Sequence, residues 1–126
     1  MSVIYLLDTN IIVDFFENIP AAVTLIDGLK PSQIAISVIT YTESLVGFDD
    51  LAQERVFEYF ISNVKYLQID RSTARIAADL RKQYHFKLPD AFQAALAKEH
   101  QLILLTRDIK DFNPSVHKFV KVPYKI

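Results

Sequence analysis

Short apolar runs alternate with longer amphipathic segments along the chain, and this alternation constrains the fold more than any other feature. The apolar runs are rich in β-branched and aromatic residues and are too short for buried helices, which is typical of buried strands. The amphipathic segments carry apolar side chains at helical spacing. Strands that alternate with helices predict an α/β fold, a three-layer α/β/α sandwich around a mostly parallel central sheet. The expected strands are Val3–Leu7, Ile34–Ile39, Val64–Ile69, Leu102–Leu105 and Lys118–Val122, and the expected helices include a segment from Pro20, Leu51–Ile61, Ser72–Tyr84 and Asp90–His100.

Length and composition predict one folded domain that spans residues 1–126. A chain that is 51% hydrophobic and 23% charged is typical of a globular protein rather than a disordered one. Because it contains no cysteine, disulfide frameworks, thiolate zinc sites and cysteine nucleophiles are excluded. No apolar run reaches the roughly 18–20 residues of a membrane span, so we expect a soluble cytoplasmic protein without a membrane partner. The near balance of 14 basic and 15 acidic side chains argues against tight non-specific binding of polyanions.

Acidic side chains recur where the expected strands lead into helices. Asp8 directly follows the first strand, Glu43 the second and Asp108 the fourth, while Asp90 opens the alanine-rich helix before the fourth strand. Sites in doubly wound folds lie outside the carboxyl ends of the strands, so we expect the four carboxylates to converge. At about 5 Å and an effective dielectric constant near 20, each carboxylate pair costs roughly 3 kcal/mol, and a cation would compensate this repulsion. Oxygen ligands suit Mg²⁺ or Mn²⁺ rather than zinc, and the chemistry implied is metal-dependent phosphodiester hydrolysis.

Each of these acids also has a purely structural interpretation. Asp8 is placed to cap the following helix, and Thr40 with Glu43 has the spacing of a capping box. Asp90 follows a proline at a helix start, where a negative charge is favourable, and Asp108 is typical of a turn. Convergence of all four at one edge of the sheet is what favours the site over four separate structural roles.

Four motifs give the chain a resemblance to PIN-domain ribonucleases and, at this size, to the VapC toxins of prokaryotic toxin–antitoxin pairs. They are LLDTNIIVDF near the start, S-x-I-T-x-x-E-x-x-x-G from Ser37, LPDAFQAALAKEHQL from Leu88 and LLTRDIKDF from Leu104. Their order and spacing match the family across nearly the whole chain. The resemblance implies a Mg²⁺- or Mn²⁺-dependent endoribonuclease with an RNA substrate, a cognate antitoxin as partner, and a homodimer.

The resemblance also assigns roles to individual residues. The acids implied to be catalytic are Asp8, Glu43, Asp90 and Asp108, of which Asp8 and Asp90 are implied to bind the metal, and the supporting polar residues are Asn10 and Thr106. The chain departs from the family in two places. Asp108 stands where many relatives have asparagine, and AFQAALA replaces the more usual ALIAATA, so Phe92 and Gln93 are expected to reshape the pocket.

The remaining charged residues divide into two groups. Arg107 and Lys110 flank Asp108 and are candidates for contacts with RNA phosphates. Asp111 belongs to the last motif and is the remaining acid with the best claim to touch the site. We interpret as solvated or capping residues Asp14, Glu17, Asp49, Asp50 and Asp70, and we expect surface or turn roles for His85, His100 and His117.

Aromatic side chains are numerous near the helices that precede the third expected strand. They are Phe15, Phe16, Phe48, Phe57, Tyr59 and Phe60. Core packing accounts for most of them, and a protruding apolar surface would serve a dimer or an antitoxin helix.

Two other classes of α/β protein fit the motifs less well than the nuclease toxin. A haloacid-dehalogenase-like enzyme requires D-x-D after the first strand, where this chain has Asp8-Thr9-Asn10, and a receiver domain requires an acidic pair at that place. Both are therefore disfavoured. Two alternatives stay open: a PIN-like module that binds RNA or protein without cleavage, and a PIN nuclease of RNA processing that has no antitoxin.

Overall fold

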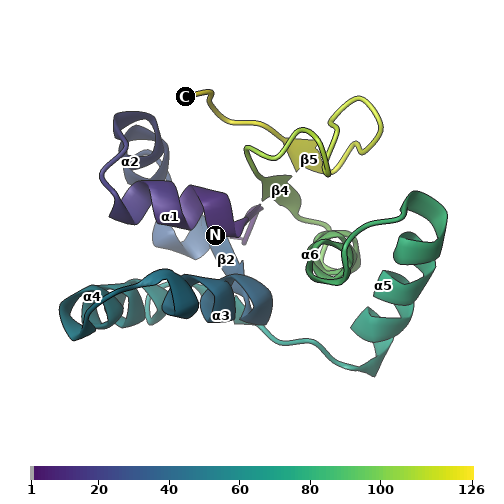
Figure 1. Ribbon diagram of the computed structural model, residues 1–126, viewed down its shortest axis with the longest axis horizontal. Helices are drawn as coiled ribbons and strands as arrows, with labels where there is room; N and C mark the ends of the chain where they lie inside the picture. Colours follow the sequence, from purple (N-terminus) through teal and green to yellow (C-terminus); the bar gives the residue numbers. More distant parts are fainter. Residues whose placement is uncertain (1) are drawn as a thin grey trace.

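A parallel five-stranded sheet forms the middle layer of the computed structural model, which describes residues 2–126 (Figure 1). The strands are β1 (Tyr5–Leu7), β2 (Ile34–Ser37), β3 (Lys65–Leu67), β4 (Ile103–Leu105) and β5 (Val120–Lys121). Their order in the sheet is β3-β2-β1-β4-β5, and each neighbouring pair is parallel. Every strand lies within one of the five apolar runs predicted from the sequence.

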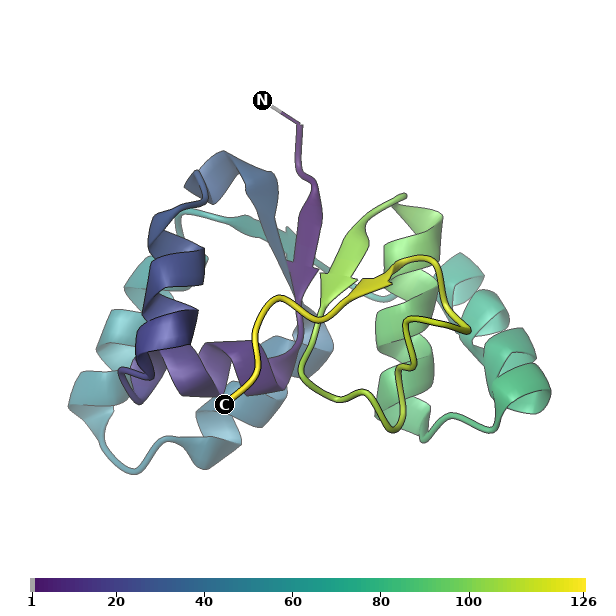
Figure 2. The same ribbon diagram turned by 90° about the horizontal axis from the view of Figure 1, so that it is seen from above.

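Helices cover both faces of this sheet. They are α1 (Thr9–Phe16), α2 (Pro20–Asp27), α3 (Val38–Gly47), α4 (Leu51–Ile61), α5 (Arg71–Tyr84) and α6 (Leu88–Glu99), with a short 3₁₀ turn, η1 (Pro31–Gln33), before β2. Figure 2 shows α1 to α4 on one side of the sheet and α5 with α6 on the other. The predicted three-layer α/β/α sandwich is confirmed.

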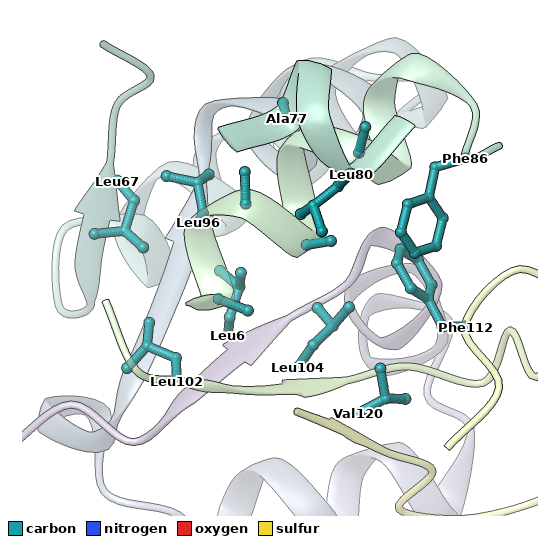
Figure 3. Packing of buried hydrophobic residues seen from close by; sticks show 14 of the residues in the cluster. Leu6, Leu67, Ala77, Leu80, Phe86, Leu96, Leu102, Leu104, Phe112 and Val120 are labelled. Carbon is teal, nitrogen blue, oxygen red and sulfur yellow. The ribbon is translucent and has the colours of Figure 1, made fainter. Parts of the chain in front are cut away.

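Two hydrophobic cores lie on opposite faces of the sheet. Leu6 and Leu104 face α5 and α6 (Figure 3), whereas the next residues along the same strands, Leu7 and Leu105, face α1 and α4. Successive side chains of a strand point to opposite faces. Because both faces are covered, consecutive strand residues such as Leu6 and Leu7 are buried, and this is why the strands read as continuous apolar runs.

Two local predictions are wrong. Thr40 does not start a capping box; the Ser37 hydroxyl accepts the backbone N–H of Thr40 at 3.1 Å, so α3 begins at Val38 and Glu43 lies in mid-helix. His117 is buried rather than at the surface, because its ring packs against aromatic side chains that include Phe86. Burial therefore lowers the pKa of His117.

Within residues 2–126, no single helix has the length and apolar character needed to cross a membrane. Helices α1 and α2 pass that test only as a pair, and the pair is bent by 105°. Their apolar side chains Ile11, Ile12 and Ile26 are buried in the core of the sandwich.

Candidate active site

The carboxyl ends of β1 and β4 lie side by side at the point where the order of the strands in the sheet reverses. β1 pairs with β2 on one side and with β4 on the other, and Leu7 and Leu105 are register partners at the end of this pair. Asp8 and Thr106 are the next residues of the two strands. The side chains that follow β1 and β4 therefore lie at the topological switch point, where parallel α/β folds place their sites.

Asp8 is buried at this point, and its carboxylate accepts hydrogen bonds from four donors. Oδ1 accepts from the backbone N–H of Thr9 at 3.0 Å and from Nε2 of Gln93 at 3.1 Å. Oδ2 accepts from the hydroxyl of Thr106 at 2.7 Å and from Nδ2 of Asn10 at 3.5 Å. Burial raises the pKa of Asp8, and the hydrogen bonds oppose that rise because they favour the ionised form. Asp8 is thus both the N-cap of α1 and a site residue.

Three further carboxylates gather beside Asp8. Asp90 lies in the first turn of α6, Asp108 and Asp111 lie in the loop after β4, and one oxygen of each lies within 4.8 Å of the others. Burial, together with the negative charges of Asp8, Asp111 and Asp108, raises the pKa of Asp90 to about 7. This shift is the signature of carboxylates that lack a compensating cation.

Asp111, the remaining acid with the best claim to touch the site, lies within this cluster. The Asp108 carboxylate accepts the backbone N–H of Lys110 at 3.2 Å and that of Asp111 at 3.0 Å. This turn, the structural role expected for Asp108, brings Asp111 back toward α6, where Lys87 Nζ lies 3.9 Å from its Oδ2. The signal in the sequence was the D-x-x-D spacing, which suits a side chain that caps its own loop.

Glu43 lies on the other side of Asp8, apart from the three clustered acids. One of its oxygens, Oε1, accepts the hydroxyl of Thr9 at 2.5 Å, and its charge contributes to the raised pKa of Asp8. The structure therefore brings Asp90, Asp108 and Asp111 together, and it places Glu43 outside this cluster, bound to Thr9.

The two supporting polar residues connect α1 to the loop after β4. Asn10 donates to the Thr106 hydroxyl at 3.1 Å and accepts the backbone N–H of Arg107 at 3.1 Å. Thr106 also accepts the backbone N–H of Asp108 at 3.0 Å. These bonds hold the base of the acidic loop against Asp8.

Arg107 has a structural role that the sequence analysis did not anticipate. Its guanidinium binds Asp14 through two hydrogen bonds, Nε to Oδ2 at 2.5 Å and Nη2 to Oδ1 at 3.0 Å, and the Tyr124 hydroxyl donates to the same Oδ2 at 2.7 Å. The prediction that Asp14 is solvated or capping is wrong, because its side chain is 5% exposed. Lys110, by contrast, is exposed.

The oxygen atoms that this pocket offers as metal ligands fit a hard divalent cation. The clustered ligand atoms are all carboxylate oxygens, the set that Mg²⁺ and Mn²⁺ prefer, and no cysteine is available in the chain for softer metals. A cation would balance the charges that raise the pKa of Asp90. Among the described residues, the ammonium of Lys87 is the positive charge that opposes this shift.

A parallel α/β/α sandwich with an acidic pocket at its switch point is the arrangement expected of a PIN-type domain. The family model of the PIN domain matches residues 5–113, and the chain belongs to this family. Over 117 residues it is 31% identical to the tRNA(fMet)-specific endonuclease VapC of Shigella flexneri, with 86% of this chain and 89% of the relative covered. Within the PIN family the chain is VapC-like.

Solved structures of toxin–antitoxin complexes share this fold. A toxin–antitoxin complex from Klebsiella pneumoniae matches with a TM-score of 0.88 and 37% identity, covering 97% of this chain and 99% of that one. The DNA-bound VapBC of Salmonella typhimurium matches with a TM-score of 0.74 and 28% identity, covering 87% and 90%. The predicted family, the VapC-like PIN domains of toxin–antitoxin pairs, is confirmed.

Proposed function

We propose that this chain is a Mg²⁺- or Mn²⁺-dependent endoribonuclease that acts as the toxin of a toxin–antitoxin pair, with residues 1–126 as one nuclease domain. The observation that carries the proposal is the cluster of Asp90, Asp108 and Asp111 beside the buried, four-fold hydrogen-bonded Asp8. Membership of the PIN family and likeness to an endonuclease support it. Since RNA is the proposed substrate, we expect the protein to act in the cytoplasm.

Asp8, Asp90 and Asp108 would hold the divalent cation, with Asp111 beside them. When bound, such an ion supplies a water molecule of lowered pKa and stabilises negative charge on the phosphate. The chain supplies the positioning. Asp8 is oriented by its hydrogen-bond donors, which favour its ionised form against the effect of burial. Asp90, with a pKa of about 7, carries a proton on its carboxylate for part of the time at neutral pH in the absence of a cation.

The proposed substrate is RNA, and transfer RNA is the first class to test. The Shigella relative is named for its action on tRNA(fMet). The chain has a formal net charge of −1, so phosphate contacts must come from local basic residues rather than from an overall positive field. Lys110 and Lys87 are exposed near the acidic pocket and would supply such contacts.

The decisive experiment is cleavage of a panel of purified tRNAs and messenger RNAs by metal-stripped protein, with Mg²⁺, Mn²⁺, Zn²⁺ or EDTA added. We expect fragments with Mg²⁺ or Mn²⁺, and none with Zn²⁺ or EDTA, because the pocket offers oxygen ligands. Asp8→Asn should abolish cleavage, while Asp79→Asn, a change in an exposed ion pair on α5, should not. Expression of the parent chain, but not of Asp8→Asn, should slow bacterial growth.

Three outcomes separate the alternatives. Undiminished cleavage in EDTA would contradict the metal proposal. RNA that is bound but stays intact with every metal would favour a binding module. Metal-dependent cleavage by a chain that has no antitoxin gene beside its own would favour an RNA-processing nuclease.

We also propose a cognate antitoxin as partner, because the neighbouring structures are toxin–antitoxin complexes. The surface suited to it is a shallow apolar groove between α1 and α4, lined by Phe15, Phe16, Val56, Tyr59 and Phe60. We call this surface the aromatic groove. The homodimer implied by the resemblance stays a prediction.

A further inference from the structure

A glutamine side chain is fully buried next to the Asp8 carboxylate. Gln93 lies on α6, is 1% exposed, and interrupts a face of the helix that is otherwise made of buried apolar residues such as Ala94 and Ala97. Burial of an amide without partners costs free energy, so such a residue is retained only where every polar atom is satisfied. The hydrogen bonds of Gln93 therefore show what it does.

The directions of these hydrogen bonds leave one orientation for the amide. The Thr40 hydroxyl donates to the carbonyl oxygen of Leu7 at 3.2 Å, so it can only accept from Gln93 Nε2, at 2.8 Å. The Ser37 hydroxyl donates to Gln93 Oε1 at 2.5 Å. With the oxygen end bound to Ser37 and one N–H bound to Thr40, the second N–H points at Asp8.

This second N–H completes the coordination of one oxygen of Asp8. Oδ1 accepts from Gln93 and from the backbone N–H of Thr9, and a carboxylate oxygen has about two lone-pair sites. Oδ2 accepts one short hydrogen bond, from the Thr106 hydroxyl at 2.7 Å, and one long one, from Nδ2 of Asn10 at 3.5 Å. The Thr106 hydroxyl also accepts the backbone N–H of Asp108. Oδ2 is therefore the oxygen on the side of the acidic loop, and Oδ1 is fully engaged inside the protein.

We propose that Gln93 is a positioning residue that restricts Asp8 to a single metal-binding oxygen, Oδ2, and thereby favours Mg²⁺ over Ca²⁺. This inference rests on the proposed function, since it requires Asp8 to bind a cation. Mg²⁺ demands near-ideal octahedral geometry, whereas Ca²⁺ accepts more ligands, flexible geometry and bidentate carboxylates. An Asp8 carboxylate released from Gln93 can turn and offer both oxygens, an arrangement that suits Ca²⁺ better than Mg²⁺.

The test is calorimetric titration of the metal-stripped full chain with Mg²⁺ and separately with Ca²⁺. Gln93→Met keeps the length of the side chain and removes its donors. We expect the Mg²⁺ affinity to fall about 10-fold, as is usual when a partner of a metal ligand is lost, while the Ca²⁺ affinity falls less. The ratio Kd(Ca²⁺)/Kd(Mg²⁺) should then decrease about 5-fold.

Two further variants keep the test independent of folding. Ser37→Ala removes the donor that holds Gln93 Oε1 without touching Asp8, and it should shift the ratio in the same direction by a smaller factor. Ser44→Ala removes another buried hydroxyl of α3, one whose oxygen has no hydrogen-bond partner among the described residues, and it should leave the ratio unchanged. If Gln93→Met does not fold, Ser37→Ala decides the question.

The outcomes distinguish this inference from the proposed function. An unchanged ratio in Gln93→Met, or equal losses of affinity for both ions, would overturn the role of Gln93 while Asp8-dependent Mg²⁺ binding by the parent still supports the nuclease. Both proposals would be overturned if the parent chain bound neither ion. They would also be overturned if the Asp8→Asn variant bound both ions as tightly as the parent does.

Discussion

Asp8 combines two roles that are usually weighed against each other, a helix cap and a site carboxylate. Its Oδ1 accepts the first backbone N–H of α1, while Oδ2 faces Thr106 and the acidic loop. The positive end of a helix dipole also favours a negative charge there. A capping interpretation therefore does not count against a functional one at a strand-to-helix junction, because the same geometry creates the anchored carboxylate.

At the residue scale, the ion pair of Asp14 and Arg107 predicts a loss of stability rather than of RNA affinity. Asp14→Asn leaves the Arg107 guanidinium, which is 31% exposed, without its partner. We expect the free energy of unfolding, measured in urea, to fall by about 2–3 kcal/mol. This loss is smaller than that from breaking a fully buried ion pair, because Arg107 reaches solvent. Tyr124→Phe, which removes one hydrogen bond to Asp14, should cost about 1 kcal/mol.

Lys110→Gln is the matched change for this prediction. Lys110 is exposed, so its replacement should alter stability by less than about 0.5 kcal/mol but weaken RNA binding and its dependence on salt. RNA affinity is measured on the inactive Asp8→Asn background at several salt concentrations. The structural role of Arg107 is refuted if Asp14→Asn unfolds like the parent.

At the scale of the elements, the sequence predicted what depends on periodicity and missed what depends on hydrogen bonds between distant residues. The limits of α4 were predicted to the residue, because an apolar stripe and the capping Asp50 mark them locally. The start of α3 was misplaced because Ser37 sits inside an apolar run, and its role as cap competes there with the strand pattern. No local signal joins Asp14 to Arg107, whose contact spans 93 positions.

The candidate site shows the same division. Asp8, Asp90 and Asp108 could be predicted because each follows a strand or lies at the start of a helix, which is a local feature. Glu43 lies in mid-helix, and its place depends on the course of α3. Gln93 was noted only as a departure from the family pattern, since its contact with Asp8 spans 85 positions. The place of Asp111 in the cluster depends on the turn that Asp108 organises, and this turn is not evident from helix or strand periodicity.

The aromatic groove predicts a binding surface on α1 and α4. Val56 and Tyr59 on α4 are 58% and 75% exposed. Exposed apolar side chains that gather in one groove indicate a surface that binds a partner. Val56→Glu should abolish neutralisation of RNA cleavage by the antitoxin encoded beside the gene, measured with purified proteins. Val116→Glu, a control of equal exposure (57%) that lies outside the groove, should not.

Cleavage and the melting temperature of the free chain should be unchanged in both variants, since exposed substitutions have small effects on stability. If Val56→Glu is neutralised as well as the parent, the antitoxin binds elsewhere. If it instead converts a dimer to a monomer in light scattering, the groove is the contact between two copies.

At the scale of the whole molecule, the fold brings charges together that weaken it. Asp90 has a pKa of about 7 in the folded chain, against an ordinary value of 3.8. The folded state therefore holds a proton that the unfolded state releases. It follows that the contribution of Asp90 to the stability of the metal-free protein is greatest below about pH 4, is lost as the pH rises from about 4 to about 7, and is constant above that range.

Asp90→Asn should remove this dependence on pH, because asparagine keeps the shape and cannot ionise. At pH 7.5 the metal-free variant should be more stable than the metal-free parent by about 1–2 kcal/mol, or roughly 4–8 °C in Tm, less any benefit of the aspartate to the first turn of α6. Mg²⁺ at about 100 times its Kd should add about 2.7 kcal/mol to the parent and less to the variant, since only the parent retains the full set of ligands. Thermal melts of both proteins from pH 4 to 8, with and without Mg²⁺, measure each of these differences. If Asp90→Asn melts below the parent in the absence of metal and Mg²⁺ shifts both equally, Asp90 serves only the first turn of α6 and the metal site must lie elsewhere.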